Sequence, residues 1–180
     1  MQFLEKTKKS IFSLIILVLL ILSFFVFKFA LEKEKIYSPK ITDNQINTDF
    51  EVIDLIEEKK INFDQILLGK NFYLINIWSS WCEPCKDESE YLLELKNNTP
   101  IMMIGINYKD KKKNALNFLK LYGDPFEKIF VDKQGLISIN FGAYGVPETF
   151  LINNDNKVLK KYIGPLNDED VYEIKKITKN

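Results

Sequence analysis

Histidine and arginine are both absent from this chain of 180 residues, and cysteine occurs only twice. Without histidine, the chain cannot supply a Ser-His or Cys-His dyad, a histidine ligand to zinc or a histidine ligand to haem. All 25 basic residues are lysines, and residues 31–180 hold 21 of them against 24 acidic residues. A mildly acidic segment without arginine is a poor candidate for nucleic-acid binding, so we expect no nucleic-acid partner.

One long apolar run lies near the N-terminus. Residues Ile11–Phe27 are apolar except for Ser13 and Ser23, and this length approaches the roughly 20 residues that a membrane-spanning helix needs. Lys28 follows the run, and its long side chain can reach the lipid headgroups. A buried core helix fits less well, because a helix that is apolar on all faces has little to pack against there. A cleaved signal peptide is the stronger alternative, but the run is long for one and no A-x-A-like cleavage site follows it.

The chain is therefore predicted to have three parts, which are a cytoplasmic N-terminus with a transmembrane anchor (1–30), a tether (31–47) and a folded domain (48–180). Lys6, Lys8 and Lys9 precede the apolar run. Under the positive-inside rule, these lysines predict a cytoplasmic N-terminus and an extracytoplasmic folded domain.

Short apolar or alternating segments predict strands, and longer stretches with helical spacing predict helices. The expected strands are 50–54, 61–68 (a strand with a turn), 72–78, 101–106, 129–131, 149–153 and 158–163. The expected helices are 85–97, 111–122 and a last one that begins at Asn167 or Asp168. Asp110 is expected to cap the second helix, with Leu116 and Leu119 facing the core.

This order is βαβαβ, followed by a hairpin and a final helix. Strands that are joined through helices run parallel, whereas the two strands of a hairpin run antiparallel. The expected fold class is therefore α/β, with a mixed central sheet, helices on both faces and one N-terminal transmembrane helix.

The two cysteines belong to the segment Trp81-Cys82-Glu83-Pro84-Cys85, between a buried strand and a helix. Unpaired N–H groups and the macrodipole at a helix N-terminus favour a thiolate, the form that attacks disulfides. Cys82 is therefore expected to be exposed and to attack, and Cys85, facing inward, to resolve the mixed disulfide. Such a redox-active disulfide needs no other cofactor, and none is expected.

Other uses of a C-x-x-C pair fit this chain less well. A zinc site needs four ligands, and the chain has no second cysteine pair and no histidine, so no metal site is predicted. A c-type haem attachment needs histidine after the second cysteine, where this chain has Lys86. A purely structural disulfide across two intervening residues would constrain little chain entropy.

Glu83 lies between the two cysteines, where a negative charge disfavours a thiolate at Cys82. Because stabilised thiolates make a thiol–disulfide couple oxidising, this charge predicts a shift towards the reducing direction. Glu83 is therefore a candidate for redox tuning, with a side chain that points into solvent as the alternative.

Three segments together resemble a known family. They are residues 76–85 (NIWSSWCEPC), 105–110 (GINYKD) and 141–152 (FGAYGVPETFLI), and they are similar to the periplasmic thioredoxin-like proteins of cytochrome c maturation, the DsbE/CcmG family. C-x-x-C alone is not specific, but the Gly-Val-Pro-Glu-Thr-Phe block at this distance from it is. The resemblance extends over essentially the whole chain, including the N-terminal anchor.

The resemblance implies a thioredoxin-like fold in which Pro147 is the cis-proline beside the cysteines. Val146 and Pro147 would dock a partner segment by strand-like pairing. Trp81 is expected to shield the disulfide as a partly exposed aromatic and to belong to the same docking surface. The family reduces disulfides of apocytochrome c or of haem-assembly thiol proteins, with electrons from a membrane-embedded thiol reductant. The implied location is the bacterial inner membrane, with a single pass and a periplasmic C-terminal domain.

Proton handling at Cys85 falls to glutamates, because the chain has no histidine. Thioredoxins in general have a buried aspartate where this chain has Asn76, which cannot act as a base. Glu88, one turn beyond Cys85, and Glu148, directly after Pro147, are the candidates. The alternative for Glu88 is a solvated helix carboxylate.

Two other functions are compatible with these residues. The fold can serve as a general extracytoplasmic thiol oxidase or reductase for other secreted proteins, or as a non-catalytic scaffold that binds apocytochrome. Replacing Cys82 by serine separates the two classes, since the change is harmless to a scaffold and inactivates a redox protein.

Overall fold

The computed structural model describes residues 2–32, 45–67 and 69–179, with side chains over 12–28, 45–67 and 69–179. The chain divides into two units, residues 1–40 and 41–180. Most of the predicted tether, residues 33–44, lies outside the described residues. The boundaries of the three predicted parts stay a prediction.

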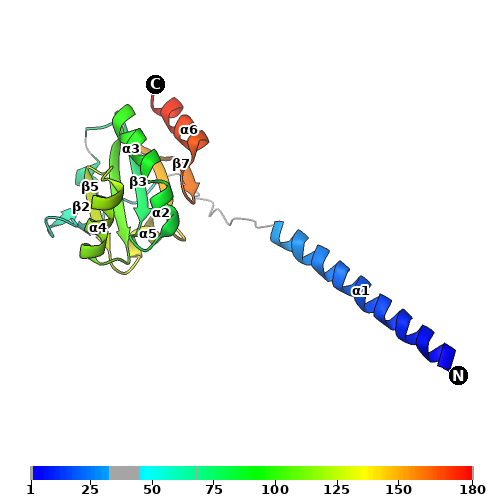
Figure 1. Ribbon diagram of the computed structural model, residues 1–180. Helices are drawn as coiled ribbons and strands as arrows, with labels where there is room; N and C mark the ends of the chain where they lie inside the picture. Colours follow the sequence, from blue (N-terminus) through cyan, green and yellow to red (C-terminus); the bar gives the residue numbers. More distant parts are fainter. Residues whose placement is uncertain (1, 33–44, 68, 180) are drawn as a thin grey trace. The chain divides into compact units, whose positions relative to one another are not determined.

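The first unit contains helix α1, Gln2–Glu32 (Figure 1). The large apolar side chains that are described in it are 44–66% exposed. Judged on the described residues alone, none of the helices has the length and apolar character that crossing a bilayer requires. The transmembrane helix of the expected fold class therefore stays a prediction.

A five-stranded mixed sheet with strand order β5-β4-β3-β6-β7 forms the centre of the second unit (Figure 1). Its strands are β3 (Phe72–Trp78), β4 (Met102–Tyr108), β5 (Lys128–Asp132), β6 (Glu148–Asn153) and β7 (Val158–Ile163). β4 pairs parallel with β3 and β5, whereas β6 pairs antiparallel with β3 and β7. The predicted mixed α/β sheet is confirmed.

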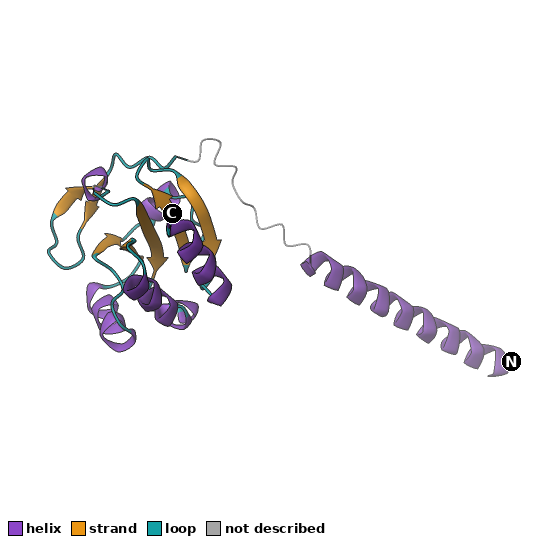
Figure 2. Cartoon of the chain, turned by 90° about the horizontal axis from the view of Figure 1, so that it is seen from above, coloured by secondary structure: helices purple, strands orange, loops and turns teal. Residues whose placement is uncertain are grey.

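Side chains of both sheet faces are buried in two core clusters. One face is covered by α2 (Glu83–Asp87), α3 (Ser89–Asn98), α4 (Lys112–Tyr122) and α6 (Asp168–Thr178). Figure 2 shows these larger helices gathered on one side of the strands. The other face is covered by α5 (Leu136–Asn140), the hairpin of β1 (Glu51–Ile53) and β2 (Lys60–Asn62), and the 3-10 turn η1 (Phe63–Ile66). Because β3 lies at the centre with both faces covered, its sequence is an almost continuous apolar run.

Several details differ from the prediction. Asp110 does not cap α4, because Lys111 holds the N-cap position and the Asp110 carboxylate has other partners. Leu116 is 39% exposed, because the buried face of α4 consists of Ala115, Phe118 and Leu119. The short helix α5 was not predicted, since its five residues are too few to show a helical period.

The predicted helix 85–97 is interrupted at Glu88, which ends α2 and precedes α3. The last helix follows the prediction, because Asn167 accepts hydrogen bonds from the backbone N–H groups of Glu169 and Asp170 and forms a capping box.

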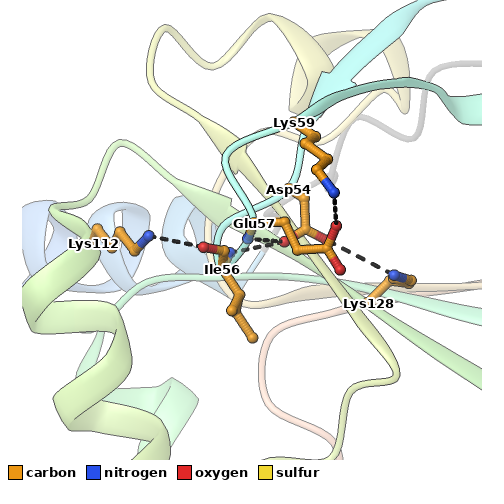
Figure 3. Close-up of polar contacts among 6 residues, drawn as sticks. All are labelled: Asp54, Ile56, Glu57, Lys59, Lys112 and Lys128. Carbon is orange, nitrogen blue, oxygen red and sulfur yellow. Dashed lines mark hydrogen bonds and ion pairs between the residues drawn. The ribbon is translucent and has the colours of Figure 1, made fainter.

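The turn between β1 and β2 contacts the main sheet through Asp54 and contacts α4 through Ile56 (Figure 3). The buried Asp54 carboxylate accepts the backbone N–H groups of Ile56 and Glu57, both at 2.8 Å, and Lys128 Nζ lies 4.0 Å from it. Lys112, the first residue of α4, donates to the carbonyl oxygen of Ile56 at 3.0 Å. The hairpin of β1 and β2 therefore contacts the first residue of α4.

Candidate active site

Cys82 and Cys85 form a disulfide at the start of α2, with their Cα atoms 5.3 Å apart. Cys82 is the N-cap residue, and its Sγ accepts a hydrogen bond from the backbone N–H of Cys85 at 3.2 Å. This N–H is one of the donors that the first turn of a helix leaves unpaired. The arrangement therefore places a hydrogen-bond donor where a thiolate forms when the disulfide is reduced.

Both cysteines are buried, with Cys82 4% exposed and Cys85 2% exposed. The prediction of an exposed Cys82 is wrong for this disulfide form, because its Sγ is bonded to Cys85 and the residue belongs to the core cluster beneath the helices. Trp81 is 58% exposed as predicted, and its Nε1 donates to the carbonyl oxygen of Lys109 at 3.2 Å. In the disulfide form, Cys82 is therefore covered, whereas the neighbouring Trp81 is exposed.

The segment that leads from β3 to Cys82 is held by Asp110. The Asp110 carboxylate accepts the N–H and the hydroxyl of Ser80 at 2.7 and 2.9 Å, the side-chain N–H of Asn107 at 3.1 Å and the N–H of Lys111 at 2.7 Å. Burial raises the pKa of Asp110, but the hydrogen bonds from Ser80, Asn107 and Lys111 outweigh it and hold the pKa below its ordinary value. Asp110 is thus a charged anchor for the loop before Cys82, a role that the sequence analysis missed.

Glu88 is completely buried one turn beyond Cys85. Its Oε1 accepts the side-chain N–H of Asn76 at 2.9 Å, and its Oε2 accepts the backbone N–H of Leu166 at 3.1 Å. Burial raises the pKa of Glu88 to about 7, although these two hydrogen bonds act in the opposite direction. The alternative of a solvated helix carboxylate is therefore wrong.

Glu88 and Cys85 line the same small cavity, together with Asn76 and Trp78. A carboxyl group with a pKa of about 7 can both take up and release a proton near neutral pH. The cavity therefore brings together the inner sulfur and a group that can exchange its proton.

The peptide bond between Val146 and Pro147 is cis, as the resemblance implies. Pro147 is buried, and the half-buried Val146 packs against both core clusters, one of which contains the two cysteines. Tyr144 and Gly145, just before them, are exposed. The backbone at Val146 thus lies where an exposed loop meets the core around the disulfide.

Glu148 is buried as well, but its surroundings differ from those of Glu88. Its Oε1 accepts the backbone N–H groups of Tyr144 and Gly145 at 2.7 and 2.9 Å. Lys161 Nζ lies 2.8 Å from its Oε2, the distance of an ion pair, although the angles are not those of a hydrogen bond. The cavity beside Cys85 is not lined by Glu148. Glu88 therefore lies in the cavity with the inner sulfur, whereas Glu148 contacts Lys161 and the loop before Pro147.

Glu83 has a side chain that is 75% exposed and forms an ion pair with Lys86. Lys86 also donates a hydrogen bond to the Glu83 carboxylate, and this bond raises the pKa of Lys86. Because Lys86 offsets the negative charge and water screens it, the field of Glu83 at Cys82 is smaller than the sequence argument assumed. The i,i+3 spacing of the two residues was a signal for this pair in the sequence.

Known proteins that are similar to this chain include thiol:disulfide interchange proteins. Residues 39–177 match the family model described as Redoxin. The thiol:disulfide interchange protein CycY of Rhizobium leguminosarum is 41% identical over 102 residues, which are 57% of this chain and 54% of that protein. The thiol:disulfide interchange protein DsbE of Allochromatium vinosum is 32% identical over 136 residues, which are 76% of this chain and 74% of that protein.

The chain spans 54–62% of the length of the first three curated relatives that it matches. Among solved structures, a secreted disulfide oxidoreductase of Mycobacterium tuberculosis, described as homologous to DsbE of E. coli, has a TM-score of 0.61. It is 16% identical, over 73% of this chain and 96% of that one. At this identity the likeness concerns the fold alone, which is thioredoxin-like.

Proposed function

Since the chain belongs to the redoxin family, and within it to the DsbE-type thiol:disulfide interchange proteins, we propose that it exchanges disulfides with partner proteins through Cys82 and Cys85. The observation that carries the proposal is the Cys82–Cys85 disulfide at the start of α2, with the buried carboxyl of Glu88 lining the cavity beside Cys85. The chain is thus a protein disulfide oxidoreductase that needs no other cofactor.

The exchange begins from the reduced pair. The Cys82 thiolate attacks one sulfur of a partner disulfide, the partner's S–S bond breaks, and the released thiolate takes up a proton. Cys85 then loses its proton to Glu88 and attacks the Cys82 sulfur. The mixed disulfide breaks, and the second partner sulfur leaves as a thiolate that takes up a proton. Two electrons and two protons have passed to the partner, and the chain ends as the Cys82–Cys85 disulfide.

Each group has a separate role in these steps. The N–H of Cys85 stabilises the thiolate at Cys82, because it donates to Cys82 Sγ. Glu88 takes the proton from Cys85 as this sulfur attacks, and it gives a proton back to Cys85 when the disulfide is next reduced, since its pKa of about 7 suits both directions. Asn76 cannot act as a base, and it instead holds Glu88 by a hydrogen bond.

The net direction is reduction of the partner, and the partners are apocytochrome c or haem-assembly thiol proteins. The similarity of residues 76–85, 105–110 and 141–152 to the cytochrome c maturation proteins supports this choice. In this proposal a membrane-embedded thiol reductant regenerates the dithiol. Because Lys86 offsets Glu83, the preference for reduction does not depend on Glu83.

The folded domain lies outside the cytoplasm on a single-pass anchor in the inner membrane. The apolar run Ile11–Phe27 and the lysines before it support this location. The described apolar side chains of α1 are exposed, as is usual for a surface that lipid covers.

Trapping in cells tests the proposal. A Cys85→Ser variant retains the attacking sulfur but cannot resolve the mixed disulfide, so it is expected to accumulate covalent adducts that reductant releases. Cys82→Ser is the matched control and is expected to trap little. The adducts are separated on non-reducing gels and identified by mass spectrometry.

Recovery of apocytochromes or haem-assembly thiol proteins supports the narrow function. A broad range of secreted proteins instead indicates a general thiol oxidase or reductase. If neither variant forms adducts and Cys82→Ser supports full cytochrome c maturation, the redox function is wrong and the chain is a scaffold.

A further inference from the structure

A cluster of contacts outside the cysteine pair holds the loop that leads to Pro147. At its centre is the Glu148 carboxylate, which is 2% exposed and accepts the backbone N–H groups of Tyr144 and Gly145. Leaving a carboxylate ionised inside a protein is costly unless a positive charge lies beside it. The structure supplies that charge from a different strand.

Lys161, on β7, has a side chain that is only 15% exposed. Its Nζ lies 2.8 Å from Glu148 Oε2 and also donates to the carbonyl oxygen of Gly142 at 2.8 Å. The same ammonium lies 4.7 Å from the centre of the Tyr144 ring, a distance typical of a cation–π contact. One lysine therefore contacts two residues of the loop, Gly142 and Tyr144, and the carboxylate that follows the loop on β6.

The sheet register explains how Lys161 reaches this position. Lys161 lies opposite Phe150, and Glu148 lies opposite Ile163, so the lysine side chain crosses diagonally from β7 to the end of β6. Phe150 forms the floor beneath it, with its ring centre 5.2 Å from Nζ. The pairing of β6 with β7 thus places the ammonium between Glu148 and the loop.

We propose that Lys161 is a positioning residue for thiol exchange, which acts with Glu148 to clamp residues 142–146 in the orientation that a partner segment needs. This inference rests on the proposed function, because Val146, at the end of the clamped loop, packs against the core cluster that contains both cysteines. A partner that pairs with this backbone has its sulfur aligned with Cys82 by the loop, whereas a small disulfide needs no such pairing. The clamp therefore selects for polypeptide substrates and is not part of the chemical step.

The test compares two disulfide substrates for each variant. Lys161→Met retains most of the aliphatic side chain and removes the charge, and Lys161→Arg restores the charge. Lys160→Met is the matched control, because Lys160 is the neighbouring residue of β7 and pairs with Glu173 instead. The reduced full chain in mild detergent is mixed with a disulfide-bonded C-x-x-C-H peptide or with oxidised glutathione, and the second-order rate constants are measured.

The clamp predicts that Lys161→Met loses roughly tenfold with the peptide while its rate with glutathione changes less than about twofold. Lys161→Arg is expected to recover most of the peptide rate, and Lys160→Met to behave as the original chain. Amide hydrogen exchange at Tyr144 and Gly145 is expected to accelerate in Lys161→Met only.

Equal slowing with both substrates, or an unchanged peptide rate, overturns the clamp. If the original chain reacts with neither substrate, the proposed function fails instead. Should Lys161→Met not fold, Glu148→Gln, which has nearly the same volume, is measured against the same control and must show the same split between the substrates.

Discussion

The proton affinity of Glu88 has a consequence for the stability of the whole domain. The carboxyl has a pKa of about 7 in the folded chain, compared with an ordinary value of 4.5, because burial disfavours its charged form. Between these two values the folded state holds a proton that the unfolded state has lost. The free energy of unfolding must therefore fall as the pH rises through this window.

The magnitude follows from the size of the shift. One pKa unit corresponds to about 1.4 kcal/mol, so a shift from 4.5 to about 7 predicts a loss of about 3 kcal/mol between pH 4 and pH 8. A Glu88→Gln variant has no proton to lose and resembles the protonated carboxyl in shape. Its stability relative to the original chain is therefore expected to rise by about 3 kcal/mol over the same range.

The assay is urea unfolding of the oxidised full chain in mild detergent, followed by the fluorescence of the buried Trp78, for both chains at pH 4, 6 and 8. Other titrating groups contribute equally to the two chains, so the difference isolates Glu88. An amide that fits its hydrogen-bond partners badly adds an offset that does not vary with pH. A difference that stays constant within about 1 kcal/mol, or one that changes in the opposite direction, refutes the assignment of a buried protonated carboxyl at this position.

Three further changes test other parts of the site. Asp110→Asn is expected to lower the free energy of unfolding by about 1–3 kcal/mol at pH 7, because the loop before Cys82 loses hydrogen bonds to a charged group. Since the pKa of Asp110 is held low in the folded chain, this loss should shrink as the pH falls through the range where carboxylates take up protons, which urea unfolding at pH 7 and pH 3 measures. Lys86→Gln should make the cysteine couple more reducing, because it leaves the charge of Glu83 without its partner. Equilibration with glutathione buffers measures the reduction potential, with Lys120→Gln at an exposed position as the control. An unchanged potential contradicts this prediction. Gly123→Ala should destabilise the domain by about 1–3 kcal/mol in thermal unfolding, since φ is +94° and the added Cβ would lie 2.6 Å from a methyl carbon of Leu93; an unchanged melting temperature contradicts it.

Features that depend on neighbouring residues could be predicted from the sequence. The apolar run 72–78 predicted β3 with the bounds that it has, because both faces of a central strand must be apolar. Asn167 predicted the start of α6, because its side chain satisfies N–H groups only two and three residues away. The C-x-x-C spacing placed both sulfurs within bonding distance, since they are separated by less than one helical turn.

The surroundings of the acidic side chains at the site depend on contacts between residues that are far apart in the chain. Glu88 receives its partners Asn76 and Leu166 from 12 and 78 residues away, so its burial and raised pKa have no local signal. The positive charge beside Glu148 comes from Lys161, and the register of the β6–β7 hairpin brings the two residues together. The pattern of apolar residues predicts the hairpin but not its exact register. The burial of Cys82 has the same origin, because the core cluster that surrounds it is assembled from strands and helices throughout the domain. The pKa of a buried carboxyl and the exposure of a cysteine depend on the sum of such distant contacts. A strand, a helix cap or a short disulfide depends only on the residues beside it.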